Sequence, residues 1–190
     1  QPQMVYSIAS NSLVFWGLLL AELGLVWFIS ARIMSLSVTT AGVLFAIYAL
    51  LNGVTFSFIF LVYTAASIAQ TFFITAGVFA AMGLVGLFIK RDLSMFGRIF
   101  YMALIGLIIA SVANWFFKND MLMSICNYLG VIIFTGLTAY DTQKIKNLLL
   151  SVGSADNEMG LRISLLGSLT LYLDFVNLFL YLLRFFGRRR

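Results

Sequence analysis

The stretch LYLDFVNLFLYLLRFF, from Leu171 to Phe186, decides the fold because it is almost wholly apolar and aromatic and still contains charge. Asp174, Asn177 and Arg184 interrupt the apolar run. A charged side chain that faces hydrocarbon at the centre of a bilayer costs at least about 2.5–3.5 kcal/mol. We therefore expect Asp174 to face other helices, which predicts that this last segment is the central helix of a bundle.

The composition of the whole chain indicates an integral membrane protein. Of its 190 residues, 62% are hydrophobic and 10% are charged, whereas a soluble protein is roughly half apolar and a quarter charged. The chain contains no His, which excludes the usual His-based zinc sites and Ser-His-Asp triads. The net charge of +5 is spread over loops, a pattern that fits anionic lipid headgroups better than nucleic acid.

Cutting the chain at its charges and turn residues leaves apolar segments near the roughly 20 residues that a spanning helix needs. Lipid offers no partner to unpaired backbone groups, and runs of this length lack the alternation of a barrel strand. We predict an all-α, polytopic membrane helix bundle that forms one domain over residues 1–190. The six predicted spans are Ser12–Ala31, Val38–Tyr63, Ile68–Ile89, Ile99–Phe117, Met121–Ile145 and Leu161–Phe186.

Basic residues in the short loops predict the orientation, since loops rich in Lys and Arg stay in the cytoplasm. The opposite loops hold no basic residue except Lys118, which lies close to Asp120. A full crossing by the last segment, which we favour because of its length, places the tail Arg188–Arg190 on the less basic side. The loops expected in the cytoplasm contain Arg32, then Lys90, Arg91 and Arg98, then Lys144, Lys146 and Arg162.

Small residues recur at helical spacing in several segments. Gly42, Ala46, Ala49 and Gly53 fall on one face of the second predicted span. Such a face lets a neighbouring helix approach closely, so we expect ordinary close packing there.

Three acidic residues lie inside the apolar segments, namely Glu22, Asp141 and Asp174. The last two belong to consecutive segments, which we expect to be antiparallel neighbours. If the carboxyl groups of Asp141 and Asp174 meet, they share a proton and titrate as a coupled pair. The alternative is that each acid forms a structural ion pair with a basic residue such as Arg162 or Lys144.

The last helix also contains a polar stripe, because Asp174, Asn177, Tyr181 and Arg184 follow one another at helical spacing. We expect this stripe to face partners inside the bundle. Two roles are open for Glu22 in the first span. Its carboxylate either lines an ion path or forms an internal hydrogen bond to Asn52 or Asn114.

Two C-terminal runs resemble the signatures of the Bax inhibitor-1, or transmembrane Bax inhibitor motif, family, especially its bacterial members. They are AYDTQKIK, which contains Tyr140 and Asp141, and SLTLYLDFVNLFLYLLRFFG, which contains Asp174. KRDLS at residues 90–94 and Glu22 occur in the order that the family has. The resemblance covers essentially the whole chain and implies a bacterial plasma (inner) membrane protein.

The resemblance implies seven helices with the last at the centre, so we expect the first family helix to precede Gln1. It also implies a calcium leak channel that is regulated by pH, with Ca²⁺ and H⁺ as its ions and no cofactor. Asp141 and Asp174 match the aspartates of the family's pH sensor and lie on the implied Ca²⁺ path. Arg32 is the nearest match to the family's latch cation. Residues implied to line or support the path are Glu22, Tyr140, Asn177 and Arg184.

A second hypothesis is a regulatory membrane protein that binds partners, because relatives are linked to cell-death control and to the membrane protease FtsH. The exposed places for docking are the tail Arg188–Arg190 and the loop Gly153–Gly160. An intramembrane aspartyl protease would also use two aspartates. Neither the YD nor the LDF context resembles the GxGD-type site of such proteases, so we do not expect an enzyme.

Overall fold

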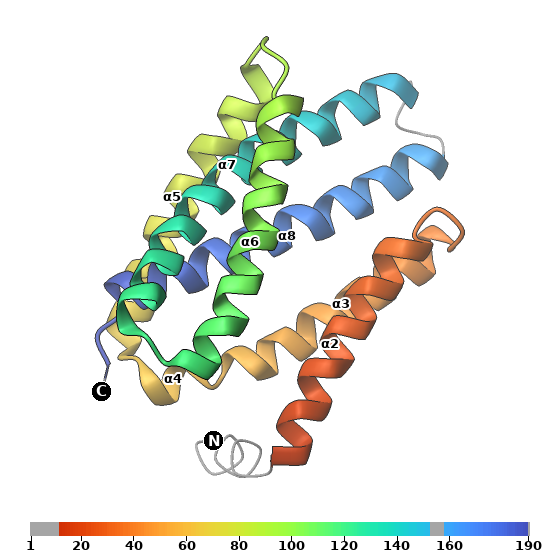
Figure 1. The fold of residues 1–190 in the computed structure, drawn as a ribbon. Helices are drawn as coiled ribbons and strands as arrows, with labels where there is room; N and C mark the ends of the chain where they lie inside the picture. Colours follow the sequence, from red (N-terminus) through yellow and green to blue (C-terminus); the bar gives the residue numbers. More distant parts are fainter. Residues whose placement is uncertain (1–11, 153–157, 190) are drawn as a thin grey trace.

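The structure, a computed structural model, describes residues 12–152 and 158–189, and these residues form a helical bundle (Figure 1). Their regular structure is helical apart from one isolated antiparallel bridge between Tyr63 and Arg189. The predicted all-α fold is therefore confirmed. The helices are α2 (Ser12–Arg32), α3 (Val38–Phe56), α4 (Ile59–Val62), α5 (Ala65–Phe88), α6 (Ser94–Phe117), α7 (Asp120–Val152) and α8 (Glu158–Phe186).

The helices match the predicted spans. In the described part of the chain, 5 helical stretches are long and apolar enough to cross a membrane, with α3 and α4 counted together as Val38–Val62. The 21 residues of α2 form a further long helix where the first span was predicted. A turn at Ser57 and Phe58 separates α3 from the short α4, so the second predicted span is interrupted rather than continuous.

Two predicted spans are more than three residues too short at their basic ends. Helix α6 begins at Ser94 rather than Ile99, and α7 continues to Val152 rather than ending at Ile145. With 33 residues, α7 is about 50 Å long, well beyond the roughly 30 Å of hydrocarbon. Charges such as Arg98 and Lys146 therefore mark where these helices leave the hydrocarbon, while the helices themselves continue.

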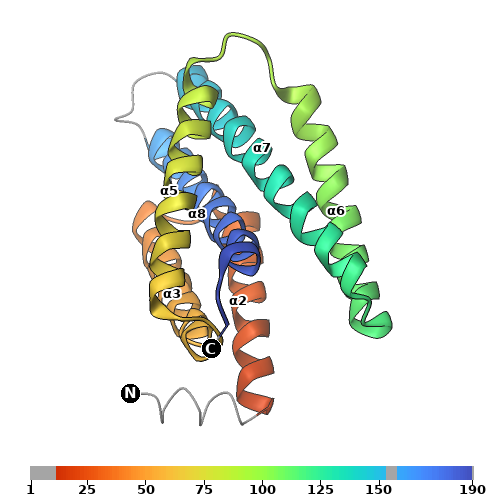
Figure 2. The same cartoon turned by 90° about the vertical axis from the view of Figure 1, so that its left-hand side faces the viewer.

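Helix α8 lies between two groups of helices. It contacts α7 and α5 on one side and α3 on the other, with α2 packed on α3. Figures 1 and 2 show α8 between the α2–α3 pair and the α5–α7 group. Its side chains enter all three buried clusters, with Leu169 beside Ile29, Leu178 beside Phe134, and Leu183 beside α5. The last helix is therefore central, as predicted.

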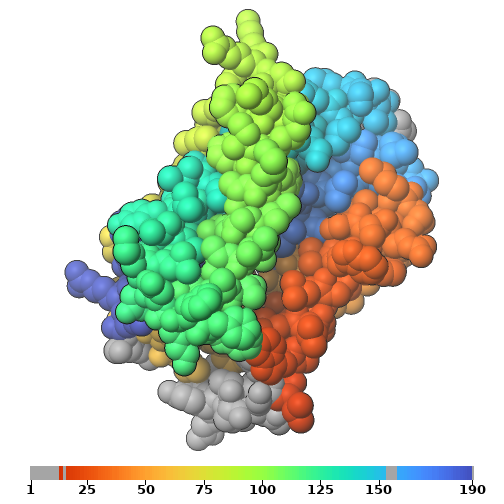
Figure 3. All heavy atoms as spheres, in the orientation of Figure 1, coloured from red at the N-terminus to blue at the C-terminus, as the bar shows by residue number. Residues whose placement is uncertain are grey.

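The outer surface of the bundle is apolar. Trp27, Phe73, Phe88 and Phe117 are each more than two-thirds exposed, and α6 and α2 form much of the face seen in Figure 3. A soluble monomer rarely exposes contiguous apolar surface on this scale. In a bilayer the same side chains contact acyl chains.

The C-terminal tail is bound to the connection between α4 and α5. Thr64 N donates to Arg188 O at 3.0 Å, and Arg188 N donates to Ser67 Oγ at 3.2 Å. The tail therefore lies at the end of the bundle opposite the α5–α6 loop (Figure 1), as a full crossing by α8 requires. The loop hypothesis at Gly153–Gly160 falls largely outside the described residues.

Close helix packing occurs at glycines other than those expected. No heavy atom of a neighbour lies within 4 Å of a Cβ built on Gly42 or Gly53, so the prediction that this face packs closely is wrong. At Gly86 of α5, by contrast, a Cβ would lie 2.3 Å from Ala139 O of α7. Spacing identifies a face with small residues but does not reveal what lies opposite, which explains the error.

Candidate functional site

The centre of the site is a pair of acidic side chains on the two longest helices. Asp141 on α7 is 2% exposed and Asp174 on α8 is 5% exposed, and their carboxyl groups lie close enough to interact directly. Ionised carboxylates are acceptors only, so a hydrogen bond between the two would require a shared proton. The structure thus brings together the two aspartates that the sequence paired.

The second oxygen of Asp174 supports a shared proton. When both acids are ionised, the buried Asp174 Oδ2 has no hydrogen-bond donor among the described residues. A buried polar atom without a partner costs about 1–3 kcal/mol. One proton held between the carboxyl groups removes this deficit, because the protonated oxygen donates to the other carboxylate.

Tyr101 on α6 completes the pair from a third helix. Its hydroxyl donates to Asp141 Oδ1 at 3.2 Å and to Oδ2 at 3.3 Å. Tyr140, one residue before Asp141, packs edge-on against the Tyr101 ring with centroids 6.0 Å apart. Tyr140 also covers Gly97, where a Cβ would lie 2.4 Å from its ring. These contacts hold the Tyr101 ring in place. Its role was not predicted, because Tyr101 lies outside the KRDLS and AYDTQKIK motifs.

Gln143 binds the loop between α5 and α6 next to the aspartate pair. Its Oε1 accepts from Leu93 N at 2.8 Å, and its Nε2 donates to Arg91 O at 2.8 Å. Arg91 and Leu93 belong to the KRDLS motif and Gln143 belongs to AYDTQKIK, so these hydrogen bonds join the two motifs. Because Gln143 follows Asp141 by only two residues, a displacement of α7 at the pair would also displace this loop.

Asp92 in the same loop lies outside the membrane-spanning segments. Its carboxylate accepts from Ser94 N at 2.9 Å and from Ser94 Oγ at 2.6 Å, and these hydrogen bonds hold the pKa of Asp92 below its ordinary value. Their contribution to the start of α6 is therefore present above the ordinary carboxyl pKa. It is lost as the pH falls through the lowered pKa.

The basic residues named from the sequence form no ion pair with the aspartates in residues 12–152 and 158–189. Arg162 pairs with Glu158 at 2.6 Å and donates to Met34 O. Lys144 lies 5.9 Å from the centroid of the Tyr140 ring. Arg32 is exposed at the end of α2, so its assignment as a latch stays a prediction.

Glu22 belongs to a separate polar contact between α2 and α3. It is 9% exposed and accepts a hydrogen bond from Thr55 Oγ1. The predicted partners are wrong, because Asn52 donates to Tyr48 O at 3.0 Å and Asn114 accepts from Asn119 N at 2.9 Å. An internal hydrogen bond at Glu22 is therefore present with a third partner, and a role in an ion path stays a prediction.

The polar stripe of α8 does not face inward along its whole length. Asn177 Nδ2 donates to Leu173 O of its own helix at 2.8 Å, and the Tyr181 ring stacks on Phe134 with centroids 5.8 Å apart. Arg184 is exposed and lines a cavity at the far end of the bundle, so the expectation is wrong for this residue. The last turn of α8 lies at the membrane boundary, where a long basic side chain reaches water.

The carboxylates have the chemistry of a transient cation site. A cavity of about 350 Å³ on the side of the basic loops is lined by Tyr140, Gln143 and Lys144 but by neither aspartate. Among the described residues no group of three or more His, Cys, Asp or Glu side chains could hold a metal ion. Ca²⁺ sites in proteins use six to eight oxygens, of which carboxylates are the usual charged ones.

Comparisons with known proteins extend over almost the whole chain. The sequence model of the family described as "Inhibitor of apoptosis-promoting Bax1" matches residues 3–190. The "Inner membrane protein YbhL" of Escherichia coli (strain K12) is 52% identical over 181 residues, which cover 95% of this chain and 77% of that protein. An uncharacterized membrane protein of Streptococcus pyogenes serotype M3 is 36% identical over 97% of this chain and 79% of its own length.

Proposed function

The chain belongs to the Bax inhibitor-1 family, and we propose that it is a pH-sensitive calcium leak channel gated by Asp141 and Asp174. It is a multi-pass integral inner membrane protein. The observation that carries the proposal is the burial of the two carboxyl groups next to each other, where α7 packs on the central helix α8.

The gate works through the shared proton. With one proton, the pair holds α7 and α8 together; without it, two negative charges remain in contact away from water. At about 4 Å and an effective dielectric constant of about 20, two unit charges repel by about 4 kcal/mol. Moving an equilibrium from 1:99 to 99:1 takes about 5.5 kcal/mol. Loss of one proton is therefore of the right size to shift a closed state toward an open one.

The same two carboxylates also attract the permeant ion. Ca²⁺ is a hard cation that prefers carboxylate and carbonyl oxygens. A pair that has lost its proton attracts Ca²⁺, and a pair that has kept it does not. Protons and Ca²⁺ therefore compete for the same site, which links flux to pH.

The test measures Ca²⁺ flux into liposomes that contain the purified protein and a calcium dye, over a range of pH. Asn at either position keeps the shape and the hydrogen bond but loses the titration, so D141N and D174N should flatten the pH profile. The matched control is D92N, because Asp92 is an aspartate of the exposed α5–α6 loop. Its pH profile should keep the wild-type shape. Profiles of D141N and D174N that match the wild type would remove the gate.

The alternative, a regulatory protein that binds a membrane protease such as FtsH or cell-death factors, has less support from the contacts. The backbone of the tail is held by Thr64 and Ser67, so it is not a free peptide for docking. Pull-down after deletion of the tail tests this alternative. Loss of a partner with an unchanged Ca²⁺ leak would favour binding as the function.

A further inference from the structure

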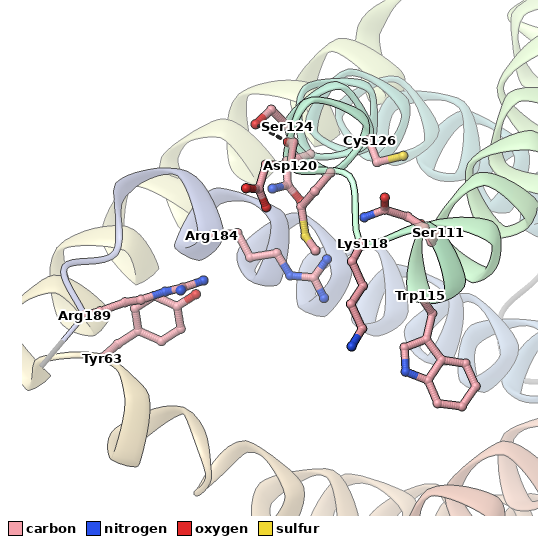
Figure 4. A pocket seen from close by; sticks show the side chains of 12 residues that line it. Tyr63, Ser111, Trp115, Lys118, Asp120, Ser124, Cys126, Arg184 and Arg189 are labelled. Atoms are coloured by element: carbon pink, nitrogen blue, oxygen red, sulfur yellow. Dashed lines mark hydrogen bonds between the residues drawn. The ribbon is translucent and has the colours of Figure 1, made fainter.

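A second polar cavity lies at the opposite end of the bundle from the α5–α6 loop. Its volume is about 730 Å³, and it opens where α6 ends, α7 begins and α8 ends. None of the residues of the aspartate pair lines it. Figure 4 shows Lys118 and Arg184 extending into the shared space, with Arg189 beside Tyr63.

The cavity carries excess positive charge. Lys118, Arg184 and Arg189 line it together with a single acid, Asp120. In the described part of the chain the only ion pair joins Arg162 and Glu158, so the three cations have no ionic partner there. Cations placed at this end also oppose the distribution that orients the chain. An anion in the cavity would neutralise them.

Lys118, which lines the cavity, has a strained backbone conformation. Lys118 has φ of 49° and is the only non-glycine residue with positive φ among those described. This left-handed conformation ends α6, a position where glycine is usual because a side chain is sterically disfavoured there. A lysine at this place gives up stability and gains a cation that extends into the cavity (Figure 4).

Other residues that line the cavity indicate its depth in the membrane and the chemical groups of its ligand. Trp115 and Tyr63 are amphipathic aromatic residues, a type that is enriched at the level of lipid headgroups. Asn127 Oδ1 is buried and has no hydrogen-bond partner among the described residues. Asn127 and Asp120 both offer acceptors, so a suitable ligand combines a phosphate with hydroxyl donors.

We propose that this cavity binds the headgroup of an anionic phospholipid with hydroxyl groups, of the phosphatidylglycerol type, from the leaflet opposite the basic loops. Arg184 and Arg189 bind the phosphodiester, with Lys118 as a third cation. The cation–π contact of Arg184 with Tyr181, at 5.4 Å, holds the guanidinium in position. The headgroup hydroxyls donate to Asn127 Oδ1 and Asp120.

The test is native mass spectrometry of the full chain in detergent, titrated with phosphatidylglycerol, phosphatidylcholine or inorganic phosphate. Wild type should bind the first phosphatidylglycerol at least about ten-fold more tightly than phosphatidylcholine. R184Q and R189Q should each lose about ten-fold, because each removes a charge-assisted contact with the phosphodiester. The matched control is R188Q, which removes the neighbouring tail arginine that does not line the cavity.

K118G separates folding from binding. Glycine suits the left-handed position, so the melting temperature should be unchanged or higher while phosphatidylglycerol binding falls. Three results would overturn the proposal: equal binding of the two lipids, an equal loss in R188Q and R189Q, or displacement of the lipid by an equal concentration of inorganic phosphate. The last result would assign the cavity to soluble phosphate instead.

Discussion

At the scale of single residues, the buried acids Glu22, Asp141 and Asp174 differ because their hydrogen-bond partners differ. Asp141 accepts a hydrogen bond from the neutral Tyr101 hydroxyl and lies next to Asp174. Asp174 depends on Asp141, because its Oδ2 has no other donor among the described residues. Glu22 accepts from Thr55 on another pair of helices. Only the first two lie next to another carboxyl group, so the proposed gate acts at one place in the bundle.

Replacing Tyr101 with Phe should shift the pH dependence of the Ca²⁺ leak. The hydroxyl donates to both oxygens of Asp141, and donation to a carboxylate favours its charged form. Without the hydroxyl the pair keeps its proton longer, so the midpoint of the leak profile should move to higher pH. Y128F is the control, because Tyr128 is 57% exposed on the same helix as Asp141. A midpoint that does not move in Y101F would contradict a direct link between Tyr101 and the gate.

Replacing Thr55 with Val should destabilise the contact between α2 and α3 without changing the pH profile. Val keeps the shape of Thr but leaves the buried Glu22 without its donor, at a cost of about 1–3 kcal/mol. Thermal unfolding in detergent should show a decrease of roughly 2–4 °C for each kcal/mol. T39V provides the comparison, since Thr39 is an exposed residue of α3. Equal melting temperatures for T55V and T39V would show that Glu22 does not need Thr55.

At the scale of helices, apolar run length was enough to predict each long helix but not its ends. The predicted starts of α2 and α3 are correct, whereas α6 begins before Arg98 and α7 passes Lys144 and Lys146. Charges end the apolar pattern but do not end helical hydrogen bonding. The start of α6 instead coincides with Asp92, whose carboxylate binds Ser94. A capping interaction of this kind carries more information about a helix end than hydropathy does.

Two glycines of α5 should respond differently to Ala. A Cβ at Gly86 would lie 2.3 Å from the backbone oxygen of Ala139, whereas at Gly83 the nearest atom is Thr142 Oγ1 at 3.9 Å. Backbone cannot move aside as a side chain can, so G86A should cost about 1–3 kcal/mol. G83A should be neutral or stabilising because Ala favours helix. Melting temperatures of the two variants test this, and an unaffected G86A would mean that α5 and α7 are not in close contact.

At the scale of the whole molecule, sequence predicted the pair but not its surroundings. Asp141 and Asp174 were found because acids are rare in apolar segments and the two segments are consecutive. The roles of Tyr101 and Gln143 depend on contacts with residues that are 40 and 50 positions away in the sequence. Tyr and Gln are also common in positions without such roles, so their types gave no signal. The central place of α8 was predictable because Asp174, the acid within its apolar stretch, needed partners on other helices.

The orientation of the whole bundle gives the last prediction. The tail is bound to the α4–α5 connection, at the end opposite the α5–α6 loop. Basic loops stay in the cytoplasm, so R188C should react with a membrane-impermeant maleimide in intact cells whose outer membrane has been made permeable. D92C should react only after the inner membrane is disrupted. Wild type is the control, because Cys126 is buried. Labelling of D92C before R188C would reverse the orientation and move the aspartate pair to the outer end of the path.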